Sequence, residues 1–138
     1  LPKILIITVL TSLDAADMKD LGYRCSVKAL VLHRAKMALE AGCDGVIASG
    51  LEAEEIKQLA QDRLLIVSPG IRLSDVSTDD HKRPATPTKA IEAGADYLVV
   101  GRPIIHAANH RQATQRILQE MQAAFEKRPR SKLFDQRK

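Results

Sequence analysis

The sequence is poor in aromatic residues and in cysteine. Tryptophan is absent and aromatic residues make up 3% of the 138 residues, so a surface on which nucleic-acid bases stack is not expected. Cys25 and Cys43 form no Cys-x-x-Cys motif, which favours reduced thiols over a disulfide framework. No apolar run approaches the ~18 residues of a membrane span, and the first residues resemble a strand rather than a signal peptide. We therefore expect a cytoplasmic protein that binds neither nucleic acid nor membrane.

The positive charge is concentrated at the C-terminal end. The whole chain has a net charge of +4, whereas residues 127–138 hold six Lys or Arg and one Asp, a net charge of +5. Residues 1–126 are therefore close to neutral. The basic segment has no periodicity and few apolar side chains, which is typical of disorder. The sequence predicts one folded domain over residues 1–126 and a disordered tail over residues 127–138.

The chain repeats a unit in which a helix end precedes a strand. Residues 39–49 read LEAGCDGVIAS and residues 91–101 read IEAGADYLVVG, with four of eleven positions identical. In each copy a Gly follows the helical pattern, as a left-handed residue that ends a helix should. The apolar run that comes next is typical of a strand buried on both faces of a parallel sheet. Two further apolar runs elsewhere in the chain are of the same kind. Together the four runs predict strands over residues 4–9, 45–49, 64–68 and 97–100.

Helical patterns separate these strands. Ser26 is expected to cap a helix that runs to Ala41, and Thr86-Pro87 to begin one that ends at Gly94. The order β-α-β-α-β-α-β-α gives a parallel sheet with helices outside it. Two more helices are expected over residues 52–60 and 110–126, the last with an inner stripe of Ala113, Ile117, Leu118, Met121 and Phe125.

Four such units cannot close an eight-stranded barrel. Either four more units precede them, or two chains pair, or the sheet is an open doubly wound one. In each case ligands are expected at the carboxyl ends of the strands.

The end of the fourth predicted strand is the best candidate for an anion site. Gly101 allows a ligand to approach the backbone closely. The guanidinium of Arg102 matches the geometry of a phosphate. Pro103 can begin a short helix whose N-terminus faces the anion.

Two other strand ends carry polar candidates. The loop over residues 68–85 contains Arg72 and His81, and loops of this length are usually functional lids or disordered. Thr11 and Ser12 follow the first strand, where their hydroxyl groups either contact a polar ligand or cap a helix that starts near Asp14.

A metal site is not expected. His106 and His110 have the i, i+4 spacing of metal ligands on a helix, but no carboxylate or Cys completes a set.

Three motifs resemble a known family. Residues 8–12 (TVLTS), 69–72 (PGIR) and 97–103 (YLVVGRP) are similar, in order and spacing, to the second half of bacterial orotidine 5′-phosphate decarboxylase. The resemblance covers residues 3–126. It implies a TIM (β/α)8 barrel of which this chain carries the last four βα units, strands five to eight.

The resemblance also implies site residues. Thr11 would contact the pyrimidine or ribose region of orotidine 5′-phosphate or UMP, and Arg72, in a mobile loop, would help to hold the phosphate end. Gly101 and Arg102 would bind the 5′-phosphate. His81 stands where the family usually has a Gln before the Thr-Pro helix start, and a histidine can still donate a hydrogen bond to phosphate.

The family's catalytic motif, Asp-x-Lys-x-x-Asp, does not occur in these 138 residues. Residues 17–22 come closest, but Gly22 replaces the second Asp. In the family the lysine protonates the carbanion left by carbon dioxide, without metal or cofactor. The resemblance thus implies a homodimeric lyase of pyrimidine synthesis, with this chain as an inactive binding half. Two alternatives remain, namely another phosphate-binding barrel such as a sugar-phosphate decarboxylase or epimerase, and a non-catalytic half-barrel module.

Overall fold

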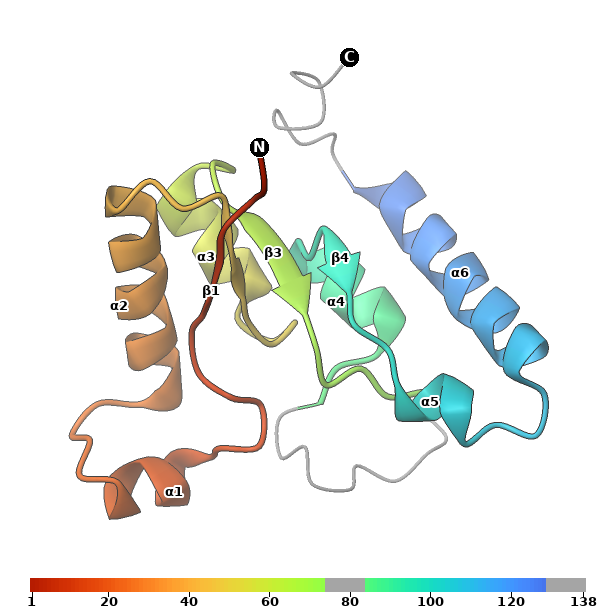
Figure 1. The fold of residues 1–138 in the computed structure, drawn as a ribbon, viewed down its shortest axis with the longest axis horizontal. Helices are drawn as coiled ribbons and strands as arrows, with labels where there is room; N and C mark the ends of the chain where they lie inside the picture. The colour runs from red at the N-terminus through yellow and green to blue at the C-terminus, as the bar shows by residue number, and fades with distance from the viewer. Residues whose placement is uncertain (74–83, 129–138) are drawn as a thin grey trace.

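The computed structural model describes residues 1–73 and 84–128, in which strands and helices alternate (Figure 1). None of the helices in this part of the chain is long and apolar enough to cross a membrane. The elements are β1 (Leu5–Ile7), α1 (Ala15–Asp20), α2 (Val27–Glu40), β2 (Gly45–Ile47), α3 (Ala53–Ala60), β3 (Leu65–Ser68), α4 (Pro87–Ala93), β4 (Tyr97–Leu98), α5 (Arg102–Ile105) and α6 (His110–Lys127).

The four strands form one parallel sheet in the order β1-β2-β3-β4. Because all strands run the same way, their carboxyl ends meet at one edge, which is the lower edge in Figure 1. The α/β class and the four predicted strands are confirmed. Each strand is shorter than expected at one end or both, since the ladder of paired residues stops where the chain turns into its loops.

In the described part of the chain, helices cover one face of the sheet and leave the other partly exposed. Val46 and Ile66, which lie side by side in the register, are fully buried beneath the helices. The next set of paired residues across the sheet ends in Ile7 on β1 and Tyr97 on β4, and these two residues are 55% and 47% exposed. Alternation along a strand places neighbouring residues on opposite faces. This partly exposed face is therefore the apolar side that an open set of four units presents.

The predicted helix ends agree with the structure. The side chain of Ser26 accepts a hydrogen bond from the N–H of Ala29, and that of Thr86 accepts one from Lys89. Gly94 follows α4 with a φ of 122°, a conformation that favours glycine. Asp14, rather than Thr11 or Ser12, caps α1 through a reciprocal bond with Asp17. The capping interpretation of Thr11 is therefore wrong.

Helix α6 packs differently from the predicted stripe. Ile117 is buried as expected, but Leu118 is 57% exposed, and Ala124 is buried in the core instead. The folded part also continues past residue 126, because Lys127 belongs to α6 and Arg128 caps it. Arg128 donates to the carbonyl oxygens of Ala95 and Gly94. The rest of the predicted tail, residues 129–138, lies outside the described residues.

Candidate functional site

Arg72 is held at the base of the loop that follows β3. Its N–H donates to the carbonyl of Ala85 at 3.0 Å, and the N–H of Ala85 donates to Gly70 at 3.3 Å, which ties the two ends of the loop together. The side chain is buried, with 6% of the residue exposed, and Nη1 donates to the carbonyl of Ile71 at 2.7 Å. Arg72 is thus fixed by the sheet edge rather than carried in the middle of the loop.

Arg102 is placed by the short helix α5, which follows β4. Gly101 occupies the position before the helix, and Pro103 lies within its first turn, as the sequence predicts. The carbonyl of Gly101 accepts hydrogen bonds from the N–H groups of Ile104 and Ile105, both at 3.0 Å. A Cβ built on Gly101 would meet no atom within 4 Å. Among the described residues the backbone here faces open space, so a ligand can approach it directly.

Arg72 and Arg102 line one cavity of about 930 Å³. The cavity therefore joins the loop after β3 to the helix after β4 and to the first half of α6. Arg116 is a third cation in its wall, and no Asp or Glu occurs among the lining residues in the described part of the chain. Three guanidinium groups without a lining carboxylate make the cavity suited to an anion such as a phosphate.

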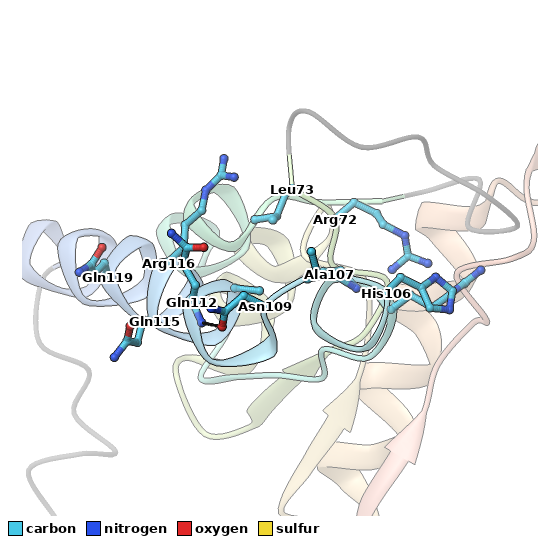
Figure 2. A pocket seen from close by; sticks show the side chains of 13 residues that line it. Arg72, Leu73, His106, Ala107, Asn109, Gln112, Gln115, Arg116 and Gln119 are labelled. Carbon is cyan, nitrogen blue, oxygen red and sulfur yellow. Dashed lines mark hydrogen bonds between the residues drawn. The ribbon is translucent and has the colours of Figure 1, made fainter.

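Figure 2 shows how the side chains that line this cavity are arranged. Arg72 extends toward His106 at one end, whereas Gln112, Gln115 and Arg116 line the part formed by α6. Leu73 lies between the two parts in this view.

Sequence reasoning did not assign His106 or the α6 side chains to this site. His106 follows Arg102 by four residues, a spacing that places both on one helical face. The sequence therefore contains a signal for His106, although the same i, i+4 spacing also links His106 to His110. His110 instead contacts the carbonyl of Ile105 through Nε2 at 3.0 Å.

Of the other predicted site residues that the structure describes, neither Gly101 nor Thr11 is among the residues that line this cavity. Thr11 follows β1 at the same edge of the sheet and is buried, with 6% of the residue exposed, but it does not line the cavity of Arg72 and Arg102. His81 lies outside the described residues, so its predicted contact with phosphate stays a prediction.

With this geometry established, comparisons with known proteins identify the family. A family model described as "Orotidine 5'-phosphate decarboxylase / HUMPS family" matches residues 1–117. The chain belongs to this family. The resemblance seen in its three motifs is thereby confirmed.

Relatives named orotidine 5'-phosphate decarboxylase match most of the chain. The protein of Nitrobacter winogradskyi is 56% identical over 123 residues, which cover 89% of this chain and 51% of the relative. The protein of Methylococcus capsulatus is 50% identical over 123 residues, which cover 88% of this chain and 51% of that relative. The chain thus spans about half the length of these family members.

Solved structures agree with this coverage. The orotidine 5'-phosphate decarboxylase of Lactobacillus acidophilus superposes with a TM-score of 0.70 at 38% identity, and covers 87% of this chain and 49% of that one. An uncharacterised conserved protein of Geobacillus kaustophilus gives a TM-score of 0.67 at 30% identity, with 87% and 49% coverage. The four-stranded sheet therefore matches about half of a family fold.

Proposed function

We propose that this chain is the second half of the barrel of an orotidine 5′-phosphate decarboxylase and holds the phosphate of the substrate. The full-length protein would convert orotidine 5′-monophosphate to UMP and carbon dioxide in pyrimidine synthesis. One observation carries the proposal. Arg72 and Arg102 follow two different strands, yet they line a single cavity that has no carboxylate among its described lining residues.

In this proposal each strand end has its own task. Arg102 and the N–H of Gly101 bind the 5′-phosphate, and Arg72 supports them from the base of its loop. His81 adds a hydrogen bond to the same phosphate. Thr11, at the end of β1, contacts the pyrimidine or ribose part of the nucleotide, which would extend from the phosphate cavity along the carboxyl edge of the sheet.

The chemical step requires a proton donor that this chain does not carry. When carbon dioxide leaves, its bond to the pyrimidine ring breaks and the electron pair stays on the ring carbon, which must then be protonated. The Asp-x-Lys-x-x-Asp lysine proposed for that task does not occur in the 138 residues, so we place it in the first half of the barrel. The phosphate contacts help by using remote binding energy to organise the reacting centre.

Two further properties belong to the same proposal. The full-length protein is a homodimer and works in the cytoplasm. Both rest on the family resemblance, and a measurement of oligomeric state in solution tests the first.

Removal of the Arg102 guanidinium tests the phosphate assignment. In the full-length protein, Arg102→Ala should weaken UMP binding and lower kcat/KM by roughly 10- to 100-fold, because a hydrogen bond to a charged group contributes about 1.5–3 kcal/mol. Arg63→Ala is the matched control, since Arg63 precedes β3 at the opposite edge of the sheet and its Nε donates to the carbonyl of Ala60 at 3.2 Å, away from the cavity. Equal kcat/KM values in the two variants would sink the assignment.

A second candidate activity is decarboxylation or epimerisation of a sugar phosphate. Two observations favour it. The cavity is lined by three arginines, which would bind the phosphate of a sugar as well as that of a nucleotide, and the matching family description joins orotidine 5'-phosphate decarboxylase with the name HUMPS. The full-length protein should bind UMP more tightly than a pentose phosphate if the first proposal holds, and the reverse order favours the second.

A further inference from the structure

One guanidinium joins the two ends of the chain segment that carries Thr11. Arg34, in the middle of α2, donates through Nη1 to the carbonyl of Thr8 at 2.5 Å and through Nη2 to the hydroxyl of Tyr23 at 3.1 Å. Its Cζ also lies 5.9 Å from the centroid of the Tyr23 ring. Thr8 is the residue after β1, and Tyr23 follows the end of α1. Residues 9–22 between them therefore form a loop that Arg34 closes.

Both anchor points of this loop are fixed by further contacts. The N–H of Thr8 donates to the carbonyl of Ile47 at 3.1 Å, and its hydroxyl donates to the same oxygen at 2.9 Å. Thr8 is 1% exposed. The N–H of Tyr23 donates to the carbonyl of Met18 at 3.0 Å, which ties Tyr23 to α1. Arg34 thus connects the sheet edge to α1 through two residues that are themselves held in place.

Thr11 lies inside the closed loop, three residues after Thr8. The loop leaves the carboxyl end of β1 and carries α1, which lies below the sheet in Figure 1, on the side of the molecule where α5 also lies. Thr11 itself lies within a turn in which the N–H of Leu13 donates to the carbonyl of Leu10 at 3.0 Å. The position of Thr11 therefore depends on where Thr8 ends the strand and on where α1 is held.

We propose that Arg34 is a positioning residue for nucleotide binding, which holds the loop over residues 9–22 in the conformation that presents Thr11. Arg34 itself does not touch the ligand, because it acts from α2 through Thr8 and Tyr23. Closing a loop at both ends reduces the number of conformations it can adopt, so less ordering is needed when a ligand binds. This inference rests on the proposed function, in which Thr11 contacts the nucleoside part of UMP.

The test is a double-mutant cycle for UMP binding in the full-length protein. Arg34→Ala and Thr11→Val are made singly and together, and the dissociation constants of UMP and of inorganic phosphate are measured for each. We expect Arg34→Ala to weaken UMP binding roughly 3- to 10-fold, and to have almost no effect in the Thr11→Val background, since residues that act through one another are not additive. The affinity for inorganic phosphate, which occupies only the cavity of Arg72 and Arg102, should stay unchanged.

Three further variants separate positioning from a general loss of structure. Arg34→Lys keeps the positive charge but replaces the two donating nitrogens of the guanidinium by a single ammonium. It should therefore retain part of the UMP affinity that Arg34→Ala loses. Tyr23→Phe removes one of the two anchors and should give a smaller loss than Arg34→Ala. Lys36→Ala is the control on the same helix, because its ammonium makes only an exposed ion pair with Glu40, and it should leave UMP binding unchanged.

The outcomes distinguish this inference from the proposed function. If UMP binds in an Arg102-dependent way but the effects of Arg34→Ala and Thr11→Val simply add, the positioning role is wrong and the proposed function stands. An equal loss of affinity for UMP and for inorganic phosphate also overturns it. If the unmodified protein does not bind UMP, the proposed function fails and this inference fails with it.

Discussion

The carboxylate of Asp96 lies 2.7 Å from the ammonium of Lys57, and both side chains are nearly removed from solvent, with 1% and 10% exposed. The same carboxylate oxygen accepts the N–H of Ile66 at 2.9 Å, and Lys57 also donates to the carbonyl of Leu64 at 3.2 Å. The pair therefore joins α3, the start of β3 and the start of β4. It lies at the amino edge of the sheet, opposite the candidate site, and so contributes to the scaffold rather than to binding.

Removal of the Asp96 charge should destabilise the fold strongly. Asp96→Asn leaves the Lys57 ammonium buried without its counter-charge, which typically costs about 3–5 kcal/mol. Glu40→Gln is the matched control, because the pair of Glu40 with Lys36 is 3.9 Å apart and exposed on both sides, and such pairs contribute at most about 1 kcal/mol. Denaturant unfolding of the full-length protein measures both. Similar free energies of unfolding for the two variants would contradict the role of the buried pair.

Asp96 also shows what the sequence repeat encodes. Asp44 occupies the equivalent position in the first copy, and its carboxylate accepts the N–H of Ile4 at 2.7 Å. Each aspartate thus accepts a hydrogen bond from the residue opposite it, which is Ile4, directly before β1, for Asp44 and Ile66, in β3, for Asp96. The repeat, the helix caps and the apolar runs are local signals, and for that reason the four βα units could be predicted from the sequence.

Other features depend on contacts between distant segments and could not be predicted. Which α6 residues face the core is decided by the packing of α6 against α4, which leaves Leu118 exposed and buries Ala124. Arg116 and Gln112 line the cavity with Arg72 only because the first half of α6 lies close to the loop that follows β3. No spacing in the sequence joins these residues, whereas Arg102 stands directly after an identifiable strand.

An ion pair between α2 and α3 should make stability depend on pH. The ammonium of Lys28 donates to the carboxylate of Glu55, and the two side chains are 58% and 32% exposed. This hydrogen bond lowers the pKa of Glu55 from its ordinary value of 4.5 and raises the pKa of Lys28 from 10.5. Glu55 therefore stabilises the fold above pH 4.5 and loses this effect as the pH falls through its lower folded value. The Lys28 ammonium stabilises the fold below pH 10.5, and this stabilisation is lost as the pH rises through the raised pKa of Lys28 in the folded protein.

Glu55→Gln should be less stable than the unmodified protein between these two pH limits. The difference in free energy of unfolding should shrink as the pH falls from 4.5 through the lowered pKa of folded Glu55, because the unfolded state binds the proton first and both states are protonated only below that lower value. Urea unfolding over a pH series measures this difference. A difference that stays constant on acidification would show that the pair does not stabilise the fold through its charges.

The arginines of the cavity should contribute unequally to phosphate binding. The side chain of Arg116 is 49% exposed and lies 3.7 Å from the carboxylate of Glu120, so solvent and this partner screen its charge. Arg116→Ala should raise the dissociation constant of UMP by less than about 5-fold, which corresponds to an exposed charge contact of up to ~1 kcal/mol. Titration calorimetry with Arg102→Ala alongside gives the comparison. A larger loss for Arg116→Ala than for Arg102→Ala would place the phosphate at the α6 end of the cavity.

Alanine substitutions at two glycines of the carboxyl edge should affect different properties, stability for Gly50 and UMP binding for Gly101. A Cβ on Gly101 would meet nothing within 4 Å, whereas a Cβ on Gly50 would lie 2.7 Å from the Cβ of Ala90 and 2.9 Å from its Cα. Gly50→Ala should therefore destabilise the protein by about 1–3 kcal/mol through overpacking. Gly101→Ala should change the free energy of unfolding by no more than ~0.5 kcal/mol, but its methyl group would occupy the space through which phosphate approaches the backbone. Thermal unfolding and UMP titration of both variants test the contrast, and undiminished UMP affinity in Gly101→Ala would remove Gly101 from the proposed phosphate site.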